Sequence, residues 1–188
     1  VTIEGKPIHV NAFNIPSLPE SLHIRASIPE MLQHAVDVTC AQGGLPMINH
    51  PNFKWAFGAA GMLTVKDWSL LEIHNASTEC NNFGCGGRVG VEAMWDALLS
   101  AGRRVHGVAT DDAHHVLAER WGHVSPPGLA WVRANVSERT VPALMAALAA
   151  GEFYSSTEIE LDDLSLSQSE LRLRIRQEHD YGYTTQFI

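Results

Sequence analysis

Residues 104–114 read RVHGVATDDAH, and this stretch decides how the rest of the chain is interpreted. The apolar residues of its first half predict a strand, and two carboxylates and a histidine follow directly. Asp112 and His114 lie two positions apart, so their side chains point the same way in an extended or turning segment. A carboxylate and an imidazole presented together suit zinc, manganese or iron. The stretch therefore predicts a metal site, although a turn-forming aspartate beside a solvated histidine gives the same pattern.

Strands and helices alternate on either side of this stretch. Apolar runs predict strands over residues 7–13, 45–49, 70–73, 104–109 and 129–134. Capping residues and apolar stripes predict helices from Ser27 to about residue 41, over 88–101 and over 140–150. This spacing is typical of βαβ units, so we expect an α/β fold with a parallel sheet or barrel. The tail differs, because residues 159–166 and 171–176 alternate like the strands of an antiparallel hairpin.

Polar side chains stand where the predicted strands end. In α/β folds, functional residues collect beyond the C-terminal ends of the strands. The candidates at three such ends are His50, then Glu72 with Asn75, then Asp112 with His114. His9 lies inside a predicted strand, where an isolated histidine is more often a packed core residue than a ligand. His9 becomes a candidate ligand only because the chain carries the other candidate ligands as well.

Composition and charge exclude several classes of protein. The chain has 188 residues and a formal net charge of -8, which argues against nucleic acid as a general partner. No apolar run is long enough to suggest a membrane span, and no secretory signal is visible, so the default location is the cytoplasm. The three cysteines are interpreted as free thiols in a reducing compartment.

Other catalytic machinery is poorly supported by the sequence. The chain has no G-x-S-x-G elbow and no G-x-G-x-x-G dinucleotide loop. The hydroxyl run Ser155-Ser156-Thr157 is similar to a phosphate-cradling segment but lacks its glycines, and serines at a strand edge explain it equally well. The His/Asp/Glu group is therefore the candidate site, and metal-activated water is its natural chemistry.

The ordered set of motifs resembles the PHP (polymerase and histidinol phosphatase) family of metallohydrolases. The motifs are IHVNAF, INHPN, LEIHNAS, VATDDAHH, AWVRAN and GEFYSST, which together cover nearly the whole chain. The resemblance implies part of a distorted, TIM-like (β/α)7 barrel that holds two or three zinc, manganese or iron ions. It implies that the metal ligands are His9, His50, Asp112 and His114.

The remaining site residues are assigned with the same resemblance in view. Glu72 and Asn75 match an E-x-x-N strand end, where we expect them to support the ligands more than to bind metal directly. We predict catalytic roles for Glu72 and Asp111. We predict substrate contacts for Asn75, Arg88 and His115, with Arg88 or Arg133 offering a charge-assisted contact to a phosphate.

The chain departs from the family pattern in two places. The N-terminal H-x-H and T-D-H motifs are absent, as is a glutamate expected shortly before Val1, and Glu158 stands where the family commonly has glycine. We expect the chain to be the C-terminal part of a longer protein that has roughly 70 to 90 more N-terminal residues. Within the chain, we expect residues 1–157 to form the metal-binding barrel and residues 158–188 a β-hairpin extension.

Three functions follow from this interpretation. The first is a metal-dependent phosphoesterase acting on a small, phosphorylated substrate, because family members are mainly phosphoesterases. The second is the same metal site acting on an uncharged ester, carbamate or amide, as in the branch similar to carbaryl hydrolase. A pocket lined by Phe53, Trp55 and Phe83 instead of arginines favours this second function. The third is a barrel that binds metal or a partner without catalysis.

Overall fold

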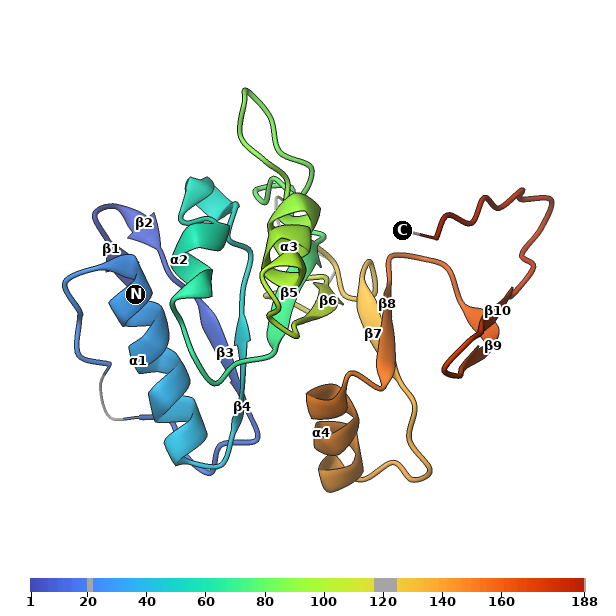
Figure 1. Cartoon of the computed structure of the whole chain (residues 1–188), viewed down its shortest axis with the longest axis horizontal. Helices are drawn as coiled ribbons and strands as arrows, with labels where there is room; N and C mark the ends of the chain where they lie inside the picture. The colour runs from blue at the N-terminus through green and yellow to red at the C-terminus, as the bar shows by residue number, and fades with distance from the viewer. Residues whose placement is uncertain (20–21, 117–124, 188) are drawn as a thin grey trace.

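A four-stranded sheet forms the centre of a mixed α/β fold in the computed structural model, which describes residues 1–19, 22–116 and 125–187 (Figure 1). The strand order is β3-β4-β5-β6. Strands β4 (Leu45–Ile48), β5 (Leu70–Asn75) and β6 (His106–Thr110) are parallel to one another, as expected. The sheets formed by the described residues are open, so no closed barrel is present in them.

The first strand of this sheet runs in the opposite direction. Strand β3 (Val10–Phe13) is antiparallel to β4, with Val10 opposite Ile48 and Phe13 opposite Leu45. The prediction of one strand over residues 7–13 was wrong at its start, because β2 (Lys6–Pro7) pairs instead with β1 (Thr2–Ile3) in a separate hairpin. His9 therefore lies just before β3, and not in the middle of a strand.

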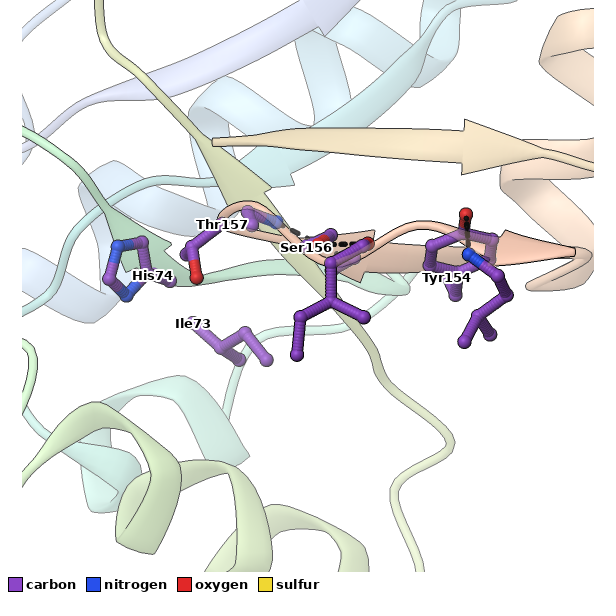
Figure 2. Close-up of a pocket in the computed structure, with 9 residues that line it drawn as sticks. Ile73, His74, Tyr154, Ser156 and Thr157 are labelled. Atoms are coloured by element: carbon purple, nitrogen blue, oxygen red, sulfur yellow. Dashed lines mark hydrogen bonds between the residues drawn. The ribbon is translucent and has the colours of Figure 1, made fainter. Parts of the chain in front are cut away.

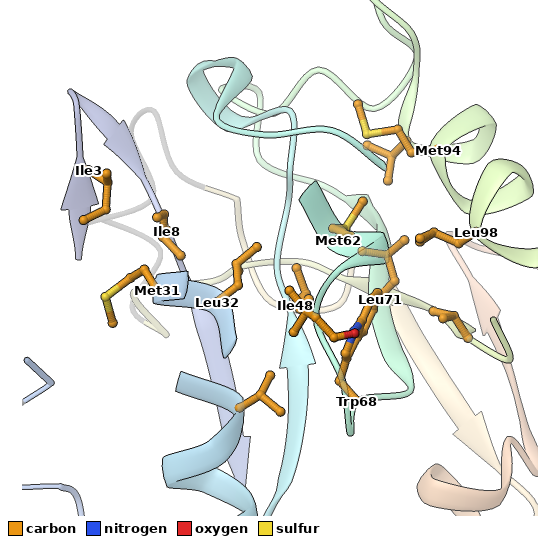
Figure 3. Packing of buried hydrophobic residues seen from close by; sticks show 14 residues of the cluster. Ile3, Ile8, Met31, Leu32, Ile48, Met62, Trp68, Leu71, Met94 and Leu98 are labelled. Carbon is orange, nitrogen blue, oxygen red and sulfur yellow. The ribbon is translucent and has the colours of Figure 1, made fainter. Parts of the chain in front are cut away.

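Three helices cover one face of the central sheet and bury the larger hydrophobic core (Figure 3). They are α1 (Ile28–Ala41), α2 (Ala59–Leu63) and α3 (Val91–Ser100). The hydroxyl of Ser27 caps α1 by accepting the Glu30 N–H at 3.4 Å, which confirms the predicted start. The core side chains labelled in Figure 3 include Leu32, Ile48, Met62, Leu71 and Leu98.

The boundaries of α3 correct the predicted helix over 88–101. Gly90, in an extended conformation, is its N-cap, so Arg88 and Val89 precede the helix. Of the apolar stripe predicted at residues 91, 94, 95, 98 and 99, Val91, Met94 and Leu98 are buried and Trp95 packs against the core, whereas Leu99 is exposed. The sequence pattern did not predict α2 or the short 3-10 helix η1 (Phe53–Trp55).

The opposite face of the sheet carries a smaller core. Strand β7 (Trp131–Ala134) pairs antiparallel with β8 (Phe153–Ser156), and α4 (Val141–Ala150) connects them. Met47, Leu70 and Val108 pack there against side chains of this unit. Gly151, at a φ of 76°, ends α4 as predicted.

The C-terminal hairpin is confirmed as β9 (Leu161–Leu166) and β10 (Leu171–Ile175), paired antiparallel. Its register places leucine opposite leucine at two positions, Leu166 with Leu171 and Leu164 with Leu173. The alternate positions are polar, with Asp163 opposite Arg174 and Ser165 opposite Arg172. The hairpin is thus aliphatic on one face and polar on the other. No helix in the described part of the chain is long and apolar enough to span a membrane.

Candidate metal centre

The four predicted ligands line one cavity of about 280 Å³. Its lining consists of His9, His50, Phe53, Ser77, Glu79, Cys80, Asp112 and His114. The cavity lies beyond the C-terminal ends of β4 and β6, where the topology rule for parallel strands predicted it. Residues far apart in the sequence are therefore brought together at one sheet edge.

The side chains of His9 and His50 contact each other in this cavity. His9 precedes an antiparallel strand and His50 follows its partner, so both lie at the same end of the sheet, and the Asn49 N–H donates to the His9 carbonyl at 3.2 Å. The His9 Nδ1 lies 3.1 Å from the His50 Nε2. Two imidazole nitrogens bound to one tetrahedral zinc ion lie about 3.3 Å apart, given zinc–nitrogen bonds of about 2.0–2.1 Å. The observed separation is close to that value, and it is also the separation of an N–H···N hydrogen bond between the two rings.

Desolvation in the cavity, together with the neighbouring His50, lowers the pKa of His9 from its ordinary value. A lowered pKa favours the neutral imidazole, which is the form that binds a metal ion. The geometry and protonation of this histidine therefore agree with a ligand role.

Asp112 and His114 occupy the loop that leaves β6. Asp112 has a φ of 53°, a left-handed conformation that aspartate adopts more readily than most residues. Its Oδ2 accepts a hydrogen bond from the Asn75 side-chain amide at 3.1 Å. The His114 Nδ1 lies 2.8 Å from the Asp112 carbonyl and donates to it, so the His114 Nε2 carries the lone pair available for a metal ion.

Glu72 is buried and forms hydrogen bonds with the candidate ligand His50 and with Thr110. Its side chain is only 1% exposed; its Oε2 accepts the His50 backbone N–H at 2.7 Å, and its Oε1 accepts the Thr110 hydroxyl. Burial raises the pKa of this carboxyl, although the hydrogen bonds oppose the shift. With both oxygens engaged, Glu72 fixes the loop that presents His50.

A β-bulge aligns Glu72 with Asn75. Residues three apart on a regular strand face opposite sides of a sheet. Here Glu72 lies opposite Val108 while His74 lies opposite Ala109, so the register shifts by one residue between them. The shift returns Asn75 to the face that carries Glu72, where it contacts Asp112.

The fit to a metal ion is partial. Among residues 1–19, 22–116 and 125–187, no group of three or more His, Cys, Asp and Glu side chains has the arrangement of a metal site. The His9–His50 pair has a suitable nitrogen separation, and Asp112 and His114 line the same cavity without converging on that pair. A bound ion requires these two side chains to move toward the histidine pair.

Five predicted site residues lie outside the cavity lining: Glu72 and Asn75, which contact residues that line it, and Asp111, Arg88 and His115. The Asp111 carboxylate accepts the backbone N–H groups of Ala113 and Gly128, so it shapes the loop. The Arg88 guanidinium stacks on Trp55, with 4.9 Å from its central carbon to the ring centroid. His115 is exposed next to His114. The catalytic and substrate-contact roles given to these residues stay predictions.

The sequence did not predict that Asn52 and Asn82 hold together the loops around the cavity. The Asn82 side chain accepts the Asn75 N–H at 3.0 Å and donates to the Asn75 carbonyl at 2.8 Å. The Asn52 amide donates to the carbonyls of Asn81 and Val89, both at 2.9 Å. These asparagines tie the loop after β5 to the loop after β4. The glycine- and asparagine-rich composition of residues 81–90 indicated a loop but not these contacts.

The hydroxyl run after Tyr154 lies elsewhere, in a cavity of about 400 Å³ beside His74 (Figure 2). Ser155 donates to the Gly107 carbonyl at 2.7 Å and accepts the Ala109 N–H at 3.1 Å. Ser156 donates to the Ile159 carbonyl at 2.6 Å. Burial lowers the pKa of His74. The two serines thus satisfy backbone groups, as expected for serines at a strand edge.

Comparisons of this chain with models of protein families, with curated proteins and with solved structures found no match. The resemblance to the PHP family therefore rests on the sequence motifs alone.

Proposed function

We propose that this chain carries the metal centre of a metal-dependent hydrolase, within a distorted barrel of the PHP type. The observation that carries the proposal is the approach of His9 Nδ1 to His50 Nε2, at 3.1 Å, in a cavity that Asp112 and His114 also line. The parallel order of β4, β5 and β6, with helices on one face, agrees with a segment of such a barrel.

Four side chains would hold the metal: His9, His50, Asp112 and His114. A divalent ion bound there supplies a water of lowered pKa as the nucleophile, together with charge stabilisation. Zinc, manganese and iron all suit a set of three imidazoles and one carboxylate. The family resemblance implies two or three ions in a full-length protein, and the ligands available here are enough for one.

The surrounding residues orient these ligands. Glu72 fixes the backbone of His50, and Asn75 fixes the carboxylate of Asp112. The Asp112 carbonyl selects the tautomer of His114. Partners of this kind typically change metal affinity or activity by about 10- to 100-fold when they are removed. Both Glu72 and Asn75 are therefore positioning residues in this account.

The resemblance favours phosphoesters as substrates, and it remains the basis of that proposal. A second substrate class, uncharged esters, carbamates or amides, is favoured by a specific observation. Among the residues that the structure describes, no lysine or arginine lines the cavity, whereas the aromatic ring of Phe53 does. The other two aromatic residues expected there, Trp55 and Phe83, line separate cavities. Arg88, the predicted phosphate contact, lines a separate cavity with Trp55.

A hydrolysis screen tests the proposal. The metal-loaded chain is assayed on 4-nitrophenyl phosphate, bis(4-nitrophenyl) phosphate and a 4-nitrophenyl carbamate, beside the double variant His50→Ala/Asp112→Ala. We expect turnover that disappears with a chelator and in the double variant. A folded, metal-loaded chain that hydrolyses none of the three would contradict catalysis and support a non-catalytic metal-binding barrel.

A further inference from the structure

A second cavity, of about 420 Å³, lies between β2, η1 and the loop before α3. It shares no lining residue with the candidate metal centre. Among the residues that the structure describes, its charged lining residues are Lys6 and Arg88, and no carboxylate lines it. Its apolar walls include Trp55, Phe57 and Met94. In a chain with a formal net charge of -8, a cavity with two cations and no carboxylate favours an anionic ligand with an apolar body.

The guanidinium of Arg88 is held in place and still has free hydrogen-bond donors. It stacks on Trp55, with 4.9 Å from its central carbon to the ring centroid. Stacking occupies the flat face of a guanidinium and leaves the N–H groups at its edge available. Within residues 1–19, 22–116 and 125–187, the Arg88 side chain forms no hydrogen bond or ion pair. A planar donor group fixed in this way fits the two oxygens of a carboxylate or phosphate.

Lys6 adds the second positive charge from β2. Its Nζ donates to the Lys54 carbonyl at 3.0 Å, which fixes the ammonium group beside η1. An ammonium group has three N–H donors, so two remain for a ligand. The neighbouring carboxylate of Glu4 is exposed and forms no ion pair with any residue that the structure describes. The charge of Lys6 is therefore not neutralised by the protein.

The walls of this cavity are joined by contacts between segments that are distant in the sequence. Asn52 lines the cavity and is only 2% exposed, and its amide donates to the Val89 carbonyl at 2.9 Å. This bond holds the loop that carries Arg88 against the loop after β4. In η1, Lys54 and Trp55 have φ values of 50° and 53°, a left-handed conformation that such residues adopt only where the surrounding structure imposes it. The cavity is therefore preformed.

We propose that this cavity binds a small aromatic anion, with its carboxylate or phosphate group on Arg88 and Lys6 and its ring against the apolar walls. The two charged side chains supply charge-assisted hydrogen bonds, and Trp55, Phe57 and Met94 supply apolar contact. Binding is reversible and involves no covalent step. The site is independent of the proposed hydrolase function, because none of the four candidate metal ligands lines this cavity.

The test is calorimetric titration of the chain with two aromatic anions, 1-naphthoate and 1-naphthyl phosphate, and with the uncharged 1-naphthalenemethanol. The variants are Arg88→Gln, Arg88→Lys and Lys6→Gln. Arg139→Gln is the matched control, because Arg139 is also an exposed arginine in a loop before a helix and lies outside this cavity. The double variant His50→Ala/Asp112→Ala separates this site from the candidate metal centre. Circular dichroism confirms that each variant is folded.

We expect saturable binding of the anions and at least tenfold weaker binding of the alcohol. Arg88→Gln should weaken anion binding about tenfold, and Lys6→Gln should weaken it as well. Arg88→Lys should lie between Arg88→Gln and the parent, because it keeps the charge but loses the planar donor group. Arg139→Gln and the double variant should match the parent. Binding of only one anion would support the site and identify the charged group that it takes.

Three results would overturn the proposal. The first is a parent chain that binds neither anion. The second is an equal affinity in Arg88→Gln and Arg139→Gln, which would show that the anion does not contact Arg88. The third is loss of anion binding in the folded double variant, which would place the anion at the candidate metal centre. The first two results would leave the hydrolase proposal intact, and the third would support it.

Discussion

The side-chain amide of Asn75 donates to the Oδ2 of Asp112 at 3.1 Å, which links the end of β5 to the loop after β6. Asn75 is only 1% exposed, and its side-chain carbonyl accepts the Ser77 N–H. One asparagine thus holds both a candidate ligand and the loop that forms the cavity wall.

We predict that Asn75→Ala lowers metal affinity by about 10- to 100-fold, because Asp112 loses the contact that orients its carboxylate. The measurement is a competition titration of zinc against a chromophoric chelator. Asn135→Ala, at an exposed position after β7, is the control and should leave the affinity unchanged. An unchanged affinity in Asn75→Ala would show that this hydrogen bond does not organise the site.

A second prediction concerns Asn82, whose side chain bonds to the backbone at the end of β5. Asn82→Ala removes two hydrogen bonds to the Asn75 backbone, and each is worth about 0.5–1.5 kcal/mol. We expect the free energy of unfolding in urea to fall by roughly 1–3 kcal/mol. Asn81→Ala is a close control, because Asn81 contributes its backbone carbonyl, which the substitution retains. Equal losses in the two variants would contradict this role for the Asn82 side chain.

Much of this fold was predictable because its signals are local. The caps Ser27 and Gly151 mark helix ends, and the apolar runs that became β4, β5 and β6 have strand lengths. The direction of β3 was not predictable in this way. Whether a strand pairs parallel or antiparallel depends on a partner distant in sequence, here β4. Strand β8 was predicted only as one explanation of the serines at 155 and 156, because Phe153 to Ser156 show no apolar alternation.

The candidate site also combines residues that local signals predicted with residues whose positions depend on distant contacts. Strand ends indicated His50, Glu72 and Asp112, and the structure brings them to one region. The cavity wall could not be predicted, because Glu79 and Cys80 reach the site through a loop whose path depends on Asn52 and Asn82. The same holds for Arg88, which precedes α3 and stacks on Trp55.

A third prediction concerns the edge of β6. The Ser155 hydroxyl donates to the Gly107 carbonyl and accepts the Ala109 N–H. It therefore takes the place that the backbone of a neighbouring strand would have. Ser155→Ala leaves both backbone groups without this partner, so we expect a loss of roughly 1–3 kcal/mol in the free energy of unfolding. Ser165→Ala, on the exposed C-terminal hairpin, should change it by less than about 0.5 kcal/mol. A neutral Ser155→Ala would mean that water replaces the hydroxyl at this edge.

The fourth prediction is a pH dependence of stability. Burial, with a smaller contribution from Arg104, lowers the pKa of His106, whose ring packs edge-on against Phe153 at 6.2 Å between centroids. In the unfolded chain this histidine takes up a proton near pH 6.5, whereas the folded chain binds it only at lower pH. Stability from His106 is therefore complete above pH 6.5 and is lost as the pH falls from 6.5 to the lowered folded-state pKa.

His106→Phe should reduce this loss of stability while keeping the aromatic contact with Phe153. The check is urea unfolding of the parent and the variant at several pH values between about 5 and 7.5. An identical pH slope in the two proteins would show that the folded chain does not disfavour the His106 proton.

The central claim is that His9, His50, Asp112 and His114 bind a metal ion. The most direct test is the metal content per chain, measured by mass spectrometry after metal supplementation, in the parent and in His50→Ala/Asp112→Ala. The account predicts at least one equivalent of zinc, manganese or iron in the parent and its loss in the folded double variant. A folded parent that binds no metal, or a double variant that retains it in full, would contradict the claim.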